Sequence, residues 1–520
     1  MAHAPTTPPD SVNEKLNADG LKFFLLAGGV IGLISAFITC WFFGGLRQFY
    51  LSYLMAYVFC LSFAVGGLFV VMLQHATKAG WSVVVRRVPE ALAGSFPILV
   101  LLALPLVVSV FLPGRIEIAK VDTEVAGENW AAHKMFEKMP NLYPWASGPG
   151  DPYAGGHGDD DSDRHDHGDD HGSGEEVSAN DFPAEYVAAD AAGDHHAGDH
   201  HVAKPFTELD QVATVDAVYK HFIYDEYTEG KSAYLNGPFW TGRLLIYLGG
   251  LLVLGNWYYR TSVKQDTAKD PELSIKMRAR SYPGFLLFSL LVSLAAFDLI
   301  MAVDPHWYST IIAVYFFAGS AVAIFATMAI AYSVMLGKGL LKDAVTTEHL
   351  HDIGKFLFAF VFFWGYIAFS QYMLIWYGAL AEESTWFARR GASMVSENLA
   401  ITAQGTIYAA GFWTIVAAAV LVGHFIIPFA GLLSRHVKRN RVLLSFWGVW
   451  LLIFHWIDIY WLIMPEMPGG LWYKVPVVPI LATVGVGGIF AFYALGNLTA
   501  HRLVPASDPR LPESLAFHNI

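Results

Sequence analysis

Three ionisable side chains fall deep inside apolar runs of the sequence: Asp298, His455 and Asp458. At the rise of an α-helix they lie about 22, 21 and 25 Å from the inner start of their runs. A charge at such a depth costs about 2.5–3.5 kcal/mol on insertion scales, so it usually has a function. His455 and Asp458 are spaced i, i+3 and share a helix face. Arg243 lies near the outer end of another run, where it can neutralise either aspartate.

Further polar residues lie toward the ends of these apolar runs and between them. Aspartate, histidine and tyrosine can pass protons, and histidine titrates in the useful pH range. We therefore predict a proton pathway made of two polar halves, one from each side of the membrane. Besides the four residues above, its candidates are Asp304, His306, His351, Asp352, Lys355, Tyr366 and His424.

Each candidate also has a structural explanation. Asp352 fits a charge at a helix N-terminus, and Asp304 precedes a proline as in a turn. Arg243 fits a side chain that extends to the outer interface. His424 is expected in the inner half of the membrane and His455 in the outer half, a mismatch in depth that argues against a bis-histidine haem.

The composition indicates the elements that must position these residues. Of 520 residues 55% are apolar and 15% charged, with a mean hydropathy of +0.42; soluble proteins carry about a quarter charged residues. A spanning helix needs about 20 apolar residues. The sequence has ten such runs, at 21–43, 50–73, 96–112, 237–260, 283–303, 310–335, 354–378, 400–430, 441–464 and 473–500. We therefore predict an all-α integral membrane protein of about ten transmembrane helices.

A short internal repeat suggests how these helices group. Asp298 and Asp458 each follow an apolar residue, and each has a proline seven residues later, Pro305 and Pro465. Such tandem repeats are common in membrane proteins that carry ions. The expected arrangement is two four-helix bundles, of helices 2–5 and 6–9, with one flanking helix at each end.

Basic residues predict the orientation. The even-numbered loops hold 15 Lys and Arg, whereas the opposite short loops hold 4, so the even loops and both termini are expected in the cytoplasm. The expected segments are a polar N-terminal stretch at 1–20, helices 1–3 at 21–112, an extracytoplasmic loop at 113–236, helices 4–10 at 237–500 and a C-terminal tail at 501–520.

The loop at 113–236 is acidic and rich in histidine. It holds 26 Asp and Glu against 8 Lys and Arg, a net charge of −18. Such a stretch cannot bury enough apolar surface to fold alone, so its central part is expected to be disordered. Its histidines could bind metal weakly, but we interpret the segment as a solvated acidic one and expect no metal site.

Several classes of cofactor site leave no motif in the sequence. There is no CxxCH, no Walker loop, no GxGxxG at a strand–helix junction and no cysteine set for an iron–sulfur cluster. Cys40 and Cys60 lie in apolar runs and form no disulfide framework. We expect a chain without a catalytic residue, a redox centre or a nucleic-acid partner of its own.

Three longer stretches of the sequence resemble a known family. They are FDLIMAVDPHWYSTIIAVYFFAG from Phe297, HDIGKFLFAFVFFWGYIAFSQYMLIWYGALAEE from His351 and LVPASDPRLPESLAFHN from Leu503, joined by HFIIPF and HWIDIYWLIMP between them. Together they are similar to the ActF subunits of alternative complex III, a bacterial quinol:cytochrome c oxidoreductase. This family is itself similar to NrfD/PsrC-type membrane subunits of two four-helix bundles. The similarity covers most of 20–110 and 237–520.

The resemblance implies a function and partners. ActF subunits contribute structure and a proton route, while menaquinol is oxidised at an ActC-like subunit. Electrons then pass through iron–sulfur clusters and c-type haems on an iron–sulfur subunit and on multihaem and monohaem cytochromes. Membrane lipid and a terminal oxidase are further partners. The resemblance carries over to all the pathway candidates except His424 and Arg243, which rest on the residue pattern alone.

Three alternatives differ in class from this interpretation. A quinol-binding catalytic subunit would need an apolar cleft with a proton acceptor, and the outer residues with Trp307 and Tyr308 as walls could supply one. An autonomous ion transporter would show helices broken at matching places, which helices five to seven lack. A purely structural scaffold would tolerate neutralisation of its buried aspartates.

Overall fold

The computed structural model describes residues 9–111, 230–378, 386–387, 390, 404–466 and 475–518. Within these ranges the regular elements are helices, with no strand. Ten helical segments in the described part are long and apolar enough to cross a membrane. The predicted all-α membrane fold with ten spanning helices is therefore confirmed.

The helices differ from the predicted runs mainly at their ends. Nine of the ten spans are built on α1 (Asp19–Thr39), α2 (Gly45–Ala76), α9 (Gly237–Ala268), α10 (Glu272–Leu299), α11 (Ile312–Gly337), α12 (Thr347–Gly378), α15 (Gln404–Val420) with α16 (Ile427–Leu432), α18 (Arg441–Ile463) and α20 (Val477–Ala500). The third span, Arg87–Phe111, is divided into α3 (Arg87–Ala93), α4 (Phe96–Leu102) and α5 (Leu104–Phe111).

Two predicted boundaries are wrong. The third span begins at Arg87 rather than at 96, and the predicted loop 260–282 is largely helical, with only a short turn between α9 and α10. The hydropathy of a run marks only its apolar part. Helix α3 begins with buried, paired charges, and α9 and α10 continue through charged residues beyond their apolar parts. Helix α9 ends where Lys269 takes the left-handed conformation, at φ 54°.

The first four-helix ring contains α2, the divided third span, α9 and α10. Helix α2 packs on α3 and α10, and α9 closes the ring through contacts with α3, α4 and α10. Asn236 begins α9, because its side chain accepts a hydrogen bond from the backbone N–H of Phe239 at 2.9 Å.

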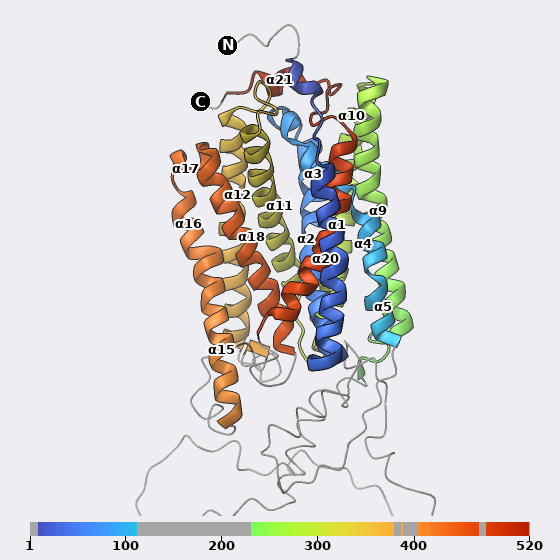
Figure 1. Cartoon of the computed structure of the whole chain (residues 1–520), viewed down its shortest axis with the longest axis vertical. Coiled ribbons are helices and arrows are strands. Elements are labelled where there is room, and N and C mark those ends of the chain that lie inside the picture. Colours follow the sequence, from blue (N-terminus) through green and yellow to red (C-terminus); the bar gives the residue numbers. More distant parts are fainter. Residues whose placement is uncertain are drawn as a thin grey trace, which may run out of the picture. The chain divides into compact units, whose positions relative to one another are not determined.

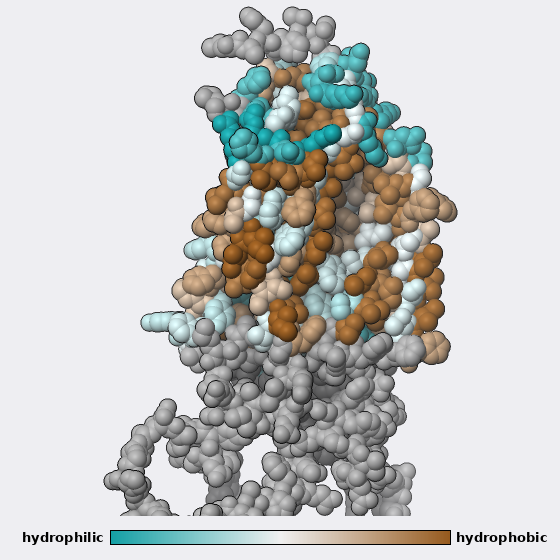
Figure 2. Space-filling model, turned by 60° about the vertical axis from the view of Figure 1, so that its left-hand side comes forward, coloured by the Kyte–Doolittle hydropathy of each residue, from teal (hydrophilic) through white to brown (hydrophobic). Residues whose placement is uncertain are grey.

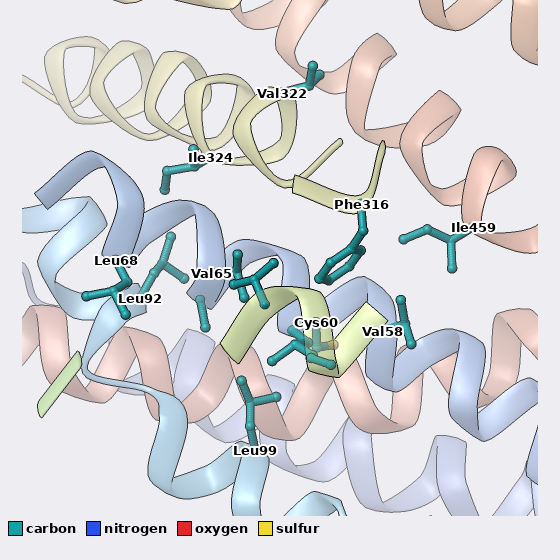
Figure 3. Close-up of a cluster of buried hydrophobic side chains, with 14 of the residues drawn as sticks. Val58, Cys60, Val65, Leu68, Leu92, Leu99, Phe316, Val322, Ile324 and Ile459 are labelled. Atoms are coloured by element: carbon teal, nitrogen blue, oxygen red, sulfur yellow. The ribbon is translucent and has the colours of Figure 1, made fainter. Parts of the chain in front are cut away.

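The second ring repeats this arrangement with α11, α12, the α15–α16 span and α18. Helix α11 packs on α12 and α18, and the α15–α16 span contacts both α12 and α18. The two rings meet where α11 packs along α2. A Cβ at Gly66 of α2 would collide with the carbonyl oxygen of Ser320 on α11, so only glycine permits this approach. Apolar side chains such as Val65, Phe316 and Ile324 fill the same interface (Figure 3).

The remaining helices, α1 and α20, form a close pair beside α2. A Cβ at Gly32 would lie 2.8 Å from the backbone nitrogen of Gly485, and one at Gly488 would lie 2.9 Å from Gly29 Cα. Small residues let the two backbones approach in this way. The predicted pair of flanking helices is therefore one packed unit.

Both ends of the described chain lie on one side of the bundle (Figure 1). The N–H of Leu503 donates to the carbonyl oxygen of Glu14 at 3.0 Å. We call this the terminal side. Figure 2 shows hydrophilic residues gathered there above a largely hydrophobic band. Large apolar side chains such as Phe23, Leu286 and Val442 are at least two-thirds exposed, as lipid-facing residues are.

Candidate functional site

Helix α18 positions the two ionisable residues that the sequence predicts on one face. The Asn440 side chain caps this helix by accepting hydrogen bonds from the N–H groups of Val442 and Leu443. Further along, His455 and Asp458 both point inward and are 1% exposed. Their predicted shared face is therefore buried against neighbouring helices.

The carboxylate of Asp458 accepts hydrogen bonds from two other helices. Tyr315 Oη of α11 donates to Oδ1 at 2.5 Å, and Trp364 Nε1 of α12 donates to Oδ2 at 3.2 Å. Within the described residues the basic side chain recorded against Asp458 is an imidazole, His424, whose Nδ1 lies 3.8 Å from Oδ2. Asp458 thus has neutral donors and a titratable neighbour but no lysine or arginine ion pair there.

His424 lies in η7 (Leu421–Ile426), a π-helical turn between α15 and α16. Its ring packs on Trp364 with centroids 4.1 Å apart and lies 5.9 Å from the ring of His455. The predicted mismatch in depth between the two histidines is therefore wrong. The prediction treated the two apolar runs as ending at one level, whereas a further helix, α17 (Arg435–Arg439), lies between α16 and α18.

The π-helical turn packs closely on α18. A Cβ at Gly423 would collide with the Phe454 ring, so glycine allows α18 to approach here. Such a turn leaves a backbone carbonyl without its usual partner, and Trp450 Nε1 donates to the carbonyl oxygen of Gly423 at 2.8 Å. The close approach holds His424 against the face of α18 that carries Asp458.

His455 is held between the two rings. Its Nε2 lies 3.0 Å from Ser62 Oγ on α2, and a Cβ at Gly319 on α11 would lie 2.9 Å from its Cε1. Its other nitrogen, Nδ1, has no hydrogen-bond partner among the described residues. We refer to the assembled group as the central cluster, which contains Ser62, Tyr315, Trp364, His424, His455 and Asp458.

Asp298 occupies the corresponding place in the first ring. Its helix, α10, corresponds to α18 in ring order, and α9 before it supplies Arg243 as η7 supplies His424 in the second ring. Arg243 Nε donates to Oδ2 at 3.0 Å and Nη2 to Oδ1 at 2.9 Å. A bidentate arginine fixes a buried carboxylate as an ion pair, so the two aspartates differ in how their charge is compensated.

The remaining pathway candidates have neighbours of their own. Asp304 accepts a hydrogen bond from the N–H of His306 at 3.1 Å, which fits the alternative that it belongs to a turn. Asp352 pairs with Lys355 at the start of α12, where His351 is also buried.

Two candidates on α12, His351 and Tyr366, do not reach the central cluster. His351 and Trp364 are separated by about 20 Å of helix at the standard rise. The Tyr366 side chain, 58% exposed, faces away from the interior. Neither is part of the cluster.

A second buried polar group, outside the predicted site residues, lies on the terminal side. Glu90 is fully buried and bonds to Arg86 Nε and Arg87 Nη1, each at 2.9 Å, while Asp508 of the C-terminal segment bonds to Arg86 and Asp266 to Arg87. We call these five residues the terminal-side charge network. Glu90 was predicted to lie in a loop, and a run of Arg-Arg-Val-Pro-Glu beside apolar sequence was the available signal.

The central cluster can hold and move a proton. The Asp458 carboxylate and the imidazoles of His424 and His455 are buried together, and the two neutral donors to Asp458 hold its carboxylate without cancelling its charge. The acidic loop and its histidines lie outside the described residues, which omit 112–229, so the predictions for that loop stay predictions.

The fold and this site define a multi-pass helical membrane protein with a buried carboxylate–imidazole centre. Comparison with models of known protein families and with curated proteins gives no match.

Proposed function

We propose that this chain is a membrane subunit of a respiratory quinol:cytochrome c oxidoreductase of the alternative complex III type. It carries no redox centre of its own and provides a proton route through the second ring. The three stretches of sequence similar to ActF subunits support the first part, and the central cluster supports the second.

The observation that carries the proton route is the environment of Asp458. Its carboxylate contacts two neutral donors and His424. Ionising a buried carboxylate that has no fixed cation beside it costs free energy. Its charge therefore depends on whether a neighbouring group can supply a proton to it. His424 at 3.8 Å is near enough to exchange a proton after a small movement or through one water.

The same proposal assigns location and partners. The chain lies in the bacterial inner membrane with its terminal side in the cytoplasm, as the distribution of Lys and Arg indicates. Its partners are an ActC-like subunit that oxidises menaquinol, an iron–sulfur subunit and the multihaem and monohaem cytochrome c subunits, with a terminal oxidase beyond them. The acidic loop then faces the periplasm.

The rival quinol-binding function has less support from the side chains. The predicted wall residue Trp307 is 2% exposed and stacks on Trp386 with ring centroids 4.0 Å apart. Arg390 covers Trp386 in turn, at 3.6 Å from its ring. This side of Trp307 therefore offers no free apolar surface to a quinol ring.

Purification from native membranes tests the membership in a complex. We expect the tagged chain, extracted in mild detergent, to copurify with c-type haem absorbance and with quinol:cytochrome c activity. If the chain purifies without haem proteins while its folded state is retained, the proposal fails. An autonomous transporter, tested by proton flux into liposomes that contain the chain alone, would then replace it.

A further inference from the structure

Ser62 and His455 form a polar contact that crosses from the first ring to the second. Ser62 Oγ of α2 lies 3.0 Å from His455 Nε2 of α18. Both side chains are buried, Ser62 completely and His455 to 1%. The direction of this hydrogen bond determines which nitrogen of His455 carries the hydrogen.

The hydroxyl hydrogen of Ser62 is already used. Ser62 Oγ lies 2.7 Å from the carbonyl oxygen of Phe59, one turn earlier in α2. A carbonyl oxygen only accepts, and a serine has one hydrogen to donate. Ser62 therefore donates to Phe59, since otherwise two acceptor oxygens would face each other at that distance. The contact with His455 is then a bond from the Nε2–H group to Ser62 Oγ.

A neutral imidazole carries one hydrogen, so the other nitrogen of His455 is bare. That nitrogen, Nδ1, is buried and has no hydrogen-bond partner among the described residues. It faces Gly319, where a Cβ would lie 3.2 Å away. The space beside the bare nitrogen therefore depends on the absence of a side chain at Gly319.

We propose that Ser62 is a positioning residue that holds His455 in the Nε2–H tautomer, with Nδ1 as the proton acceptor of the central cluster. A proton bound at Nδ1 gives an imidazolium whose Nε2–H still donates to Ser62. The same proton leaves from Nδ1, which restores the original tautomer. His455 thus takes up and returns protons at one nitrogen and does not pass them through its ring.

The consequence for transport rests on the proposed function, but the tautomer is a property of the folded chain and can be measured by itself. The probe is ¹⁵N solid-state NMR of the intact complex in liposomes, labelled at histidine. Subtraction of the His455→Gln spectrum identifies the His455 signals. In the wild type we expect one neutral form, with Nε2 protonated and Nδ1 unprotonated.

Two substitutions of Ser62 separate positioning from packing. Ser62→Ala is expected to lose the single tautomer, so that signals of a second form appear, whereas Ser62→Thr keeps the hydroxyl and the single form. Ser52→Ala is the matched control, because Ser52 is a fully buried serine of the same helix with no hydrogen-bond partner among the described residues. It is expected to leave the His455 signals unchanged.

Three results would overturn the proposal: a wild-type His455 protonated at Nδ1, a doubly protonated one at neutral pH, or an unchanged tautomer in Ser62→Ala. The wild-type spectrum tests the tautomer of His455 even if the Ser62 variants fail to assemble. If the tautomer is as expected but His455→Gln leaves proton release by the complex unaltered, the proposed proton route fails and the tautomer assignment stands.

Discussion

The His424 imidazole lies 3.8 Å from the Asp458 carboxylate in the second ring. It takes the position that corresponds to that of Arg243, which pairs with Asp298 in the first ring. The two rings thus hold equivalent aspartates with different neighbours, one a permanent cation and one a titratable ring. An arginine stays charged, so it keeps its partner carboxylate ionised and stabilises the folded state. A carboxylate beside an imidazole can instead take up and release a proton. On the proposed function, Asp298 is therefore a structural aspartate and Asp458 belongs to the proton route.

Neutralising Asp298 is expected to affect stability. Asp298→Asn leaves the Arg243 guanidinium buried and without a full countercharge, which costs about 3–5 kcal/mol for a broken buried pair. The variant complex should unfold at a lower temperature and be recovered in lower yield. Thermal unfolding of purified complexes measures this, with Asp270→Asn, in the turn after α9, as the control. Equal thermal stability of Asp298→Asn and wild type would contradict the structural role.

The space at Gly319 is expected to be needed for the central cluster. Gly319→Ala places a methyl group 2.9 Å from His455 Cε1, so the ring must move. We expect fewer protons released per electron by the complex in liposomes, with little loss of assembly. Gly337→Ala, at the end of the same helix, is the matched control because its methyl group meets Arg441 Nη1 at an ordinary 3.4 Å. Identical proton release by the two variants would contradict the prediction.

Glu90 is expected to secure the terminal-side charge network. Glu90→Gln removes the carboxylate shared by Arg86 and Arg87, so each guanidinium keeps one carboxylate partner, Asp508 or Asp266. A loss of about 3–5 kcal/mol is expected for this buried site. Glu272→Gln, at an exposed position of α10, should leave the free energy of unfolding almost unchanged. Chemical denaturation of the two variants measures the difference. Similar stability of both would refute it.

The C-terminal segment is expected to detach in acid. Burial raises the pKa of Asp508, but the Arg86 guanidinium outweighs burial and holds the pKa below the ordinary 3.8. The pair therefore stabilises the folded state fully above that ordinary value, and the contribution is lost as the pH falls through the lowered pKa. Limited proteolysis should release residues after Leu503 only at strongly acidic pH.

The Asp508→Asn variant provides the comparison for the proteolysis experiment. Its loss of a charge-assisted bond, worth about 1.5–3 kcal/mol, should expose the segment already at neutral pH. Ser507→Ala removes a hydroxyl that donates to the Asp266 carbonyl oxygen at 3.2 Å and serves as a milder control. An unchanged cleavage pattern in Asp508→Asn would show that other contacts hold the segment.

Much of the fold was predictable because lipid imposes a simple rule on the sequence. Each spanning helix needs a long apolar run, and ten such runs became ten spanning helices. The helix ends were not predictable in this way. Charges at Arg87 and Glu90 compensate one another inside the third span, and hydropathy counts each of them as a sign of a loop.

The deep residues Asp298, His455 and Asp458 were predicted from the cost of their burial alone, and Arg243 was predicted as a partner of an aspartate. The hydrogen-bond partners of His455 and Asp458 were not predicted. Ser62, Tyr315 and Trp364 are ordinary residues of apolar helices, and only the packing of α2, α11 and α12 brings them to the cluster. The proximity of His424 to His455 was not predictable, because a count of residues along the apolar runs reveals neither α17 nor the π-helical turn that contains His424.

The most direct test of the proton route is the purified complex in liposomes with Asp458→Asn. Quinol:cytochrome c turnover and the pH change outside are recorded together and compared with wild type and with Tyr366→Phe, whose side chain faces outward. We predict that both variants keep the turnover of the wild type. The number of protons released per electron should fall in Asp458→Asn only. Unchanged turnover and proton release in an intact complex would contradict the proton route and leave the chain a structural scaffold.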